Sequence, residues 1–316
     1  MKNKLLIIGK TPPPTGGVTI HVKRILDFLE INNYNFIFIE LSYLNLFKIL
    51  LSLLRFKHVH LHTNNVYLQL ILVLFSKLFK NNIILTLHGE VSQHKSLLKN
   101  WIELYSFKFA AFPIVLNSIS FDKIFKFNKQ TIIDSAYIKP FENIGLNEEL
   151  NYLISLNRIK FKGTYCTNAY DRVFDKNNKE IYGINELVKL FQNSDYFLII
   201  CDPSGSYSKA LLNLSSNILI VDYPINFNSL LSKVDGFIRN TSTDGDSISI
   251  HEALSLGIPV FSTNVVNRPQ GTVLYNCATK ELFDLIKSNP KAKSLNYYVY
   301  NENKIFDLYR KLLKDN

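Results

Sequence analysis

Two acidic residues, Asp244 and Glu252, are separated by seven others in the segment DGDSISIHEALSLGIP, residues 244–259. A helix predicted to begin near Asp246 or Ser247 would point unpaired backbone N–H groups and a positive dipole end at a ligand. Such a helix end suits a diphosphate. Glu252 lies roughly 8 Å further along the helix axis, where a carboxylate can accept hydrogen bonds from two hydroxyls of a pentose.

The helical period indicates which way Glu252 points. Ile250, Ala253 and Leu254 share one face, and Glu252 stands about 200° from Leu254, so we expect it to point away from the core. The alternative is that the aspartates only cap the helix and that Glu252 is a solvated helix position.

A second loop that could bind a ligand follows the first predicted strand and reads KTPPPTGGVTIHVKRIL. Gly16 and Gly17 let the backbone approach a ligand closely, and a helix from about Val18 offers further N–H donors. The spacing is not G-x-G-x-x-G, so the dinucleotide-binding fingerprint is absent. A plain turn is the alternative.

Four histidines gather at the ends of two predicted strands, namely His58, His60, His62 and His88. Alternate residues of a strand face the same side, so they could resemble metal ligands. No cysteine or second carboxylate accompanies them, and we expect no metal.

These loops need strands and helices to position them. Short apolar runs alternate with helical patterns, which favours an α/β fold with parallel sheets. Strands are predicted at 4–9, 35–41, 58–63, 82–88, 112–117, 130–135, 163–169, 196–202, 217–222, 234–240 and 258–263. Helices in the second half are predicted at 184–192, 208–214, 247–256, 280–287 and 304–313.

The alternation stops at residues 135–160, where Pro140, Gly145 and several Asn and Glu residues predict a hinge. We therefore expect a Rossmann-like domain at 1–145 and another at 146–316, facing each other across a cleft. The last helix could pack back on the first domain.

The net charge of +10 lies mainly in the first half, and no acidic residue occurs between Glu40 and Glu90. Basic residues punctuate the apolar runs 43–56 and 66–79, a combination that suits an anionic membrane surface. Each run is shorter than the ~20 apolar residues that span a bilayer. The alternative is that both runs are ordinary buried helices.

The remaining composition favours a cytoplasmic protein. Only five apolar residues precede Gly9, too few for a secretory signal peptide. Cys166, Cys201 and Cys277 have no C-x-x-C spacing and indicate reduced thiols.

The second acidic residue is followed by Ala253, Gly257, Pro259 and Val260 in an Ala-x-x-x-Gly-x-Pro-Val pattern. This segment resembles the donor-binding region of retaining GT-B glycosyltransferases of the family 4, group 1 type, which includes many lipopolysaccharide and capsule enzymes. The resemblance implies that Glu252 binds the donor ribose.

In the same resemblance the loop residues Gly245, Asp246, Ser247 and Ile248 bind the donor. Asp244 occupies the place of a glutamate that contacts the donor sugar, so the resemblance makes it a catalytic residue.

The resemblance also suggests roles elsewhere. Gly16 and Gly17 would lie under the donor phosphates, and His88 near the reacting sugar as a catalytic residue. The alternative for His88 is a loop histidine that only makes hydrogen bonds. Glu90 is a candidate for orienting the acceptor.

Family members carry an Arg and a Lys that neutralise the diphosphate early in the second domain. Arg172, with Lys176 or Lys179, could serve here beside Asn168 at the strand end, although the spacing differs. Tyr182 and Gly183 resemble the family's approach to the next helix.

The implied function is transfer of a sugar from a nucleoside-diphosphate sugar to a glycan acceptor, lipid-linked and at the membrane surface, with retention and without metal or cofactor. An epimerase of the same architecture and a catalytically inactive sugar-nucleotide-binding subunit are alternatives. Nucleic-acid binding is disfavoured because the basic residues are interleaved with aliphatic ones.

Overall fold

A computed structural model describes residues 4–141, 144–175, 178–276, 280–288 and 303–314, and the chain forms two compact units. The first unit contains Met1–Phe141 together with Tyr300–Asn316, and the second contains Glu142–Val299. The contacts therefore divide near residue 141, and the C-terminal helix belongs to the first unit.

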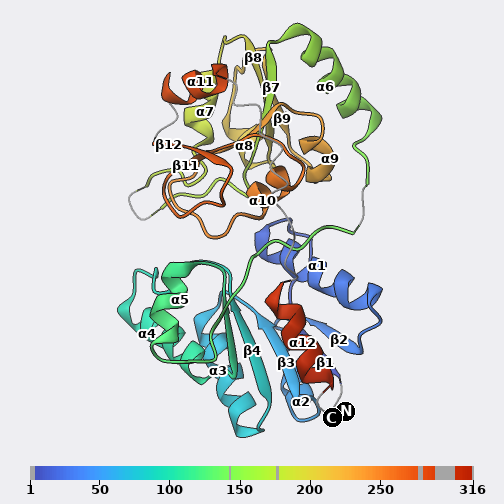
Figure 1. The fold of residues 1–316 in the computed structure, drawn as a ribbon, viewed down its shortest axis with the longest axis vertical. Helices are drawn as coiled ribbons and strands as arrows, with labels where there is room; N and C mark the ends of the chain where they lie inside the picture. The colour runs from blue at the N-terminus through green and yellow to red at the C-terminus, as the bar shows by residue number, and fades with distance from the viewer. Residues whose placement is uncertain (1–3, 142–143, 176–177, 277–279, 289–302, 315–316) are drawn as a thin grey trace. The chain divides into compact units, whose positions relative to one another are not determined.

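The first unit is built on a six-stranded parallel sheet of order β2-β1-β3-β4-β5-β6 (Figure 1). All six strands predicted for this half are present. They are β1 Leu5–Gly9, β2 Phe36–Glu40, β3 His58–His62, β4 Asn82–Leu87, β5 Phe112–Val115 and β6 Ile132–Ile133. The helices are α1 Gly17–Ile31, α2 Leu46–Leu53, α3 Val66–Leu78, α4 Leu97–Phe109, α5 Ser118–Phe125 and α12 Lys304–Lys314.

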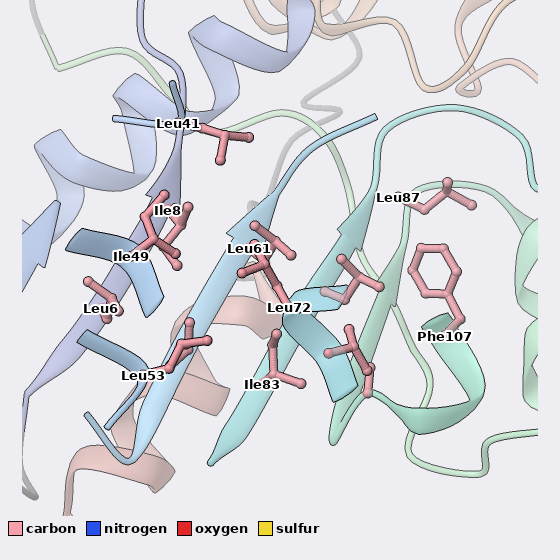
Figure 2. Close-up of a cluster of buried hydrophobic side chains, with 14 of the residues drawn as sticks. Leu6, Ile8, Leu41, Ile49, Leu53, Leu61, Leu72, Ile83, Leu87 and Phe107 are labelled. Carbon is pink, nitrogen blue, oxygen red and sulfur yellow. The ribbon is translucent and has the colours of Figure 1, made fainter. Parts of the chain in front are cut away.

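One face of this sheet forms the apolar core. Leu6, Ile8 and Leu61 from the strands pack with Ile49 of α2 and Leu72 of α3, as Figure 2 shows. Because side chains alternate along a strand, residues of opposite parity point to the other face. That other face carries the histidines of β3.

Helix α12 covers part of the histidine-bearing face. The Phe306 ring stacks on Phe28 of α1, with ring centroids 3.5 Å apart. The Tyr309 hydroxyl lies 2.5 Å from His60 Nδ1, and the Ile305 N–H donates to the Asp134 carboxylate at 2.9 Å. The C-terminal helix is thus a structural part of the first unit.

The second unit has a six-stranded parallel sheet of order β12-β11-β10-β7-β8-β9 (Figure 1). Its strands are β7 Gly163–Asn168, β8 Tyr196–Cys201, β9 Ile218–Val221, β10 Gly236–Arg239, β11 Val260–Thr263 and β12 Thr272–Tyr275. Its helices are α6 Glu148–Lys160, α7 Ile184–Phe191, α8 Ser206–Ala210, α9 Phe227–Leu231, α10 Ile248–Ser255 and α11 Lys280–Lys287.

Several elements of this half differ from the sequence-based expectation. Helix α6 occupies much of the predicted hinge, and Asn147 caps it by accepting a hydrogen bond from the Leu150 N–H at 2.8 Å. Helix α9 and strand β12 were not predicted, and α8 begins two residues early and ends after one turn.

Candidate functional site

The order of the second sheet reverses between β7 and β10. The chain runs outward through β8 and β9 and then returns to place β10 on the other side of β7. At such a point the loops at the carboxyl ends of parallel strands diverge and leave room for a ligand. Asn168 ends β7 here, Arg239 ends β10, and the loop 240–247 leads to α10.

Asp244 lies between two arginines at this point. Arg239 donates from Nε and Nη2 to its two carboxylate oxygens at 2.9 and 3.0 Å, and Arg268 Nη1 donates to Oδ2 at 2.8 Å. Burial opposes ionisation of Asp244, but the arginines outweigh it and hold the pKa of the carboxyl below its usual value. The site thus contains a buried, ionised Arg239–Asp244–Arg268 network.

The remaining acceptor capacity of Asp244 is also occupied. Its oxygens accept from the Thr241 hydroxyl at 3.3 Å and from the Gly245 N–H at 3.1 Å. A carboxylate has about four lone-pair positions. The Asp244 carboxylate therefore holds its own loop in place, and its contact with a donor sugar stays a prediction.

Asn168 connects the network to helix α10. Its amide donates to the Ser249 hydroxyl at 2.6 Å, and its oxygen accepts from Arg239 Nη1 at 3.1 Å. Ser247 is the N-cap residue of α10, but its side chain makes no capping hydrogen bond. The first-turn N–H groups of the helix are therefore not satisfied by a side-chain cap.

Asp246 contacts a histidine of α10, and Glu252 is buried. Asp246 Oδ1 lies 2.5 Å from His251 Nε2. Ile250 and Ala253 lie in the apolar core and Leu254 packs against it, as predicted. Glu252 is only 5% exposed, so the alternative of a solvated helix position is wrong. Helix α10 packs against β10, β11 and α9.

Arg172 and Lys179, proposed for the diphosphate, lie in the segment between β7 and α7. Arg172 is exposed, its guanidinium is 5.2 Å from the Phe174 ring centroid, and its backbone N–H donates to the Ser206 hydroxyl. Lys179 is exposed, and Lys176 lies outside the described residues.

Arg239 and Arg268 form ion pairs with Asp244, and neither was predicted from the sequence. An arginine that ends an otherwise apolar strand five residues before Asp244 was the available signal for Arg239.

Gly183 positions this part of the sheet. It has φ of +57°, and a Cβ there would lie 2.3 Å from Asn240 Nδ2, so only glycine fits. Asn240 in turn accepts a hydrogen bond from the Tyr275 hydroxyl at 3.0 Å. Tyr182 lies against the Arg239 guanidinium, which is 5.2 Å from its ring centroid.

In the first unit, Gly16 and Gly17 begin α1 at the corresponding reversal, between β1 and β3. A Cβ at Gly17 would meet no atom within 4 Å, so the space beside this helix start is open. Glu90 has its carboxylate occupied by Lys123 at 3.2 Å and Gln93 at 2.7 Å.

The histidines form a cluster that includes a residue not predicted. His21 of α1 joins His62 and His88, with ring centroids 5.7 and 5.2 Å away, while His60 and His62 lie 3.9 Å apart. His62 Nδ1 is 3.0 Å from His88 Nε2. Burial, and then the neighbouring histidines, lower the pKa of His60, His62 and His88 well below the usual value.

The cluster and the rest of the described chain hold no group of three or more His, Cys, Asp or Glu residues arranged to bind a metal ion. His58, at the far end of β3, contacts Asn82 rather than the other histidines, and burial lowers its pKa too.

Several solved structures share this fold. HepE from Anabaena, solved in complex with UDP, has a TM-score of 0.63 at 12% identity, over 92% of this chain and 93% of HepE. WaaG, a glycosyltransferase involved in lipopolysaccharide biosynthesis, has 0.58 at 12% identity, over 98% of each chain. Sucrose-phosphate synthase from Thermosynechococcus elongatus has 0.65 at 13% identity, over 99% of this chain and 94% of that one.

No protein-family profile and no curated protein matches the sequence. At these low identities the structural likeness concerns the fold. The chain has the GT-B fold, and the predicted α/β class with two Rossmann-like sheets is confirmed.

Proposed function

We propose that the chain transfers a sugar from a nucleoside-diphosphate sugar to a hydroxyl of a glycan acceptor, with retention at the anomeric carbon. The observation that carries this proposal is the start of α10 beside the Arg239–Asp244–Arg268 network. The two guanidiniums and one carboxylate of this network together carry one positive charge, and the helix dipole adds a positive end, while Asp246 contacts His251. A departing diphosphate is the anion that this environment favours.

In this proposal the N–H groups of residues 246–248 hold the diphosphate, beside Gly245 of the same loop, and stabilise the charge that develops on it, so no metal or cofactor is required. Glu252 accepts the hydroxyls of the pentose from its enclosed position. Asn168 orients the first turn of α10 through Ser249. In the first unit, Gly16 and Gly17 bind the donor under its phosphates, His88 lies near the transferred sugar and Glu90 orients the acceptor.

The proposed acceptor is a lipid-linked glycan of a cell-surface polysaccharide, met at the cytoplasmic face of the membrane. The likeness to WaaG supports this choice at the level of the fold. No helix among the described residues is long and apolar enough to cross a bilayer. The contact with the membrane that we propose is peripheral.

Nucleotide binding tests the proposal directly. UDP or GDP at about 1 mM should raise the unfolding midpoint more than the matching monophosphate, because a ligand bound only by the native state stabilises it. Glu252→Gln should weaken binding about tenfold or more, which is about 1.4 kcal/mol. Glu149→Gln, an exposed position on α6, is the matched control and should bind as the native chain does.

Failure of every nucleoside diphosphate to bind would contradict the proposal, and unchanged affinity in Glu252→Gln would remove Glu252 from the ribose. NMR of the donor incubated without acceptor separates transfer from epimerisation, because an epimerase would change the configuration of the sugar. The anomeric configuration of the product, read by NMR, tests retention.

A catalytically inactive sugar-nucleotide-binding subunit is the second candidate. It is favoured by one observation, that the Asp244 carboxylate is fully engaged by its own loop and the two arginines. Tight nucleotide binding with no donor hydrolysis and no transfer to any glycan would support it. Slow hydrolysis that Glu252→Gln abolishes would exclude it.

A further inference from the structure

Helix α3 presents an apolar side to solvent. Tyr67, Ile71, Leu74, Phe75 and Leu78 are all exposed, and their spacing places them on one face of the helix. The buried side of α3 is apolar as well, with Val66, Leu72 and Val73 beside Gln69 and Ser76. An ordinary surface helix has a polar outer side, so packing within this chain does not account for the apolar outer side of α3.

The neighbouring helices extend this apolar area. Helix α3 packs against α4 and α2 (Figure 1). On α4 the exposed residues Leu97, Leu98, Trp101 and Tyr105 again share one side, and Phe47 is 72% exposed on α2. The amine of Lys99 on α4 lies 6.0 Å from the Tyr67 ring centroid on α3, which links the two helices. These outer sides together are called the α2–α4 surface.

All exposed charge on the α2–α4 surface is positive. The chain has no acidic residue between Glu40 and Glu90, and the one acidic residue of α4, Glu103, is buried with its carboxylate bound to the Ser92 N–H at 2.7 Å. The exposed basic residues are Lys48, Arg55, Lys77, Lys80, Lys99 and Lys108. Several lie over aromatic rings, such as Lys77, whose amine is 4.4 Å from the Phe109 ring centroid.

This chemistry selects one kind of partner. A second copy of the chain would bring the same positive charge to a two-fold contact and would be repelled. Nucleic acid would neutralise the lysines but would leave the leucines, isoleucine and phenylalanines in water. An anionic bilayer satisfies both, because headgroups meet the lysines while the aliphatic and aromatic side chains enter the boundary with the acyl chains.

We propose that the α2–α4 surface docks the protein on an anionic lipid bilayer. This interaction is independent of catalysis at α10, because it involves another unit of the chain and no nucleotide. If the proposed transfer to a lipid-linked glycan also holds, docking brings the acceptor-side unit to the membrane that contains the acceptor.

Vesicle sedimentation of the full chain tests the proposal. The native protein should bind phosphatidylcholine vesicles containing about one third phosphatidylglycerol and should bind pure phosphatidylcholine at least tenfold more weakly. The binding to anionic vesicles should weaken as salt is raised, because the charges are exposed. No binding, or equal binding to both compositions, would overturn the proposal.

A triple variant tests the surface itself. Replacing Phe47, Leu78 and Leu97 with serine removes three side chains that are 72%, 72% and 77% exposed, so the fold should persist. The matched control replaces Ile159 and Leu212 of the second unit, 88% and 78% exposed, with serine. The triple variant should lose at least tenfold in vesicle binding, about 1.4 kcal/mol, and the control should lose none.

A second variant, Lys48→Gln with Lys80→Gln and Lys99→Gln, should lose binding to anionic vesicles only. Equal losses in the α2–α4 variants and the control would overturn the proposal. The proposal would also be overturned if the native chain formed a dimer and the serine variant did not. RNA binding that is lost in these variants would overturn it as well. UDP or GDP binding by every variant, measured alongside, keeps this test separate from that of the proposed function.

Discussion

Asp244 shows how a residue with the right type and spacing can have a structural role. Its carboxylate is buried between two guanidiniums, and each arginine is further held by backbone or side-chain oxygens, as in the 3.2 Å bond from Arg268 Nε to the Thr263 carbonyl. Buried charges are costly unless each is paired and hydrogen-bonded. The network meets that condition and fixes the loop that leads to α10.

Breaking the network should therefore destabilise the second unit. Asp244→Asn leaves two buried guanidiniums without their counter-ion, and loss of one partner of a buried pair costs about 3–5 kcal/mol. Urea unfolding measures the change. The control is Asp195→Asn, which breaks the exposed pair with Lys162 and should leave the midpoint unchanged. Equal midpoints for Asp244→Asn and the native chain would contradict the structural role of Asp244.

The buried histidines predict a dependence of stability on pH. The pKa values of His60, His62 and His88 are lowered in the folded state, first by burial, so the unfolded chain binds more protons at acid pH. Their contribution is fully present above the unfolded pKa of about 6.5 and is lost as pH falls below it. Each histidine contributes a slope that rises toward about 1.4 kcal/mol per pH unit as pH falls below the unfolded pKa.

His62→Gln removes one of these three titrations. Between pH 6.5 and 5.5, roughly the window set by the unfolded pKa, the free energy of unfolding of the variant should fall less steeply than that of the native chain. The slope is the measurement, because the substitution also changes the stability at neutral pH. If the variant has the same slope as the native chain, His62 binds its proton as readily in the folded chain as in the unfolded chain, which would contradict the prediction.

At the scale of the elements, the central strands were predictable because they bury both faces and form short apolar runs, as in LLIIG of β1. Helix α6 was missed because only Leu150 and Ile154 of its residues are buried, and its polar surface resembles a hinge. The five-residue α9 and the edge strand β12 are too short to give a period.

The candidate site was predictable only in part, because a sequence pattern indicates local structure and not the contacts between residues distant in the sequence. The strand-to-helix position of Ser247 follows from local pattern, and α10 begins one residue later. The partners of Asp244 do not follow from the local pattern. Arg268 comes from a loop after β11, and only tertiary packing brings that loop to the site. Helix α10 also packs against α9, an element that the sequence did not reveal.

At the scale of the whole molecule, the two units use the chain differently. The second unit is one continuous segment, Glu142–Val299, whereas the first needs both ends of the chain. Within the first unit, α12 supplies the Phe306 ring that stacks on Phe28 and the Tyr309 hydroxyl beside His60. Removal of α12 would uncover these groups and the Asp134 carboxylate that accepts from Ile305.

We therefore expect unequal behaviour from separated pieces. A fragment of residues 142–299 should unfold cooperatively in urea, since its sheet and core clusters are complete within it. A fragment of residues 1–141 should be less stable by several kcal/mol than the same fragment joined by a flexible linker to residues 300–316, because burial of one large aromatic side chain alone contributes about 3 kcal/mol or more. Circular dichroism during urea unfolding measures both. Equal stability with and without the C-terminal segment would mean that α12 covers the histidine face without stabilising it.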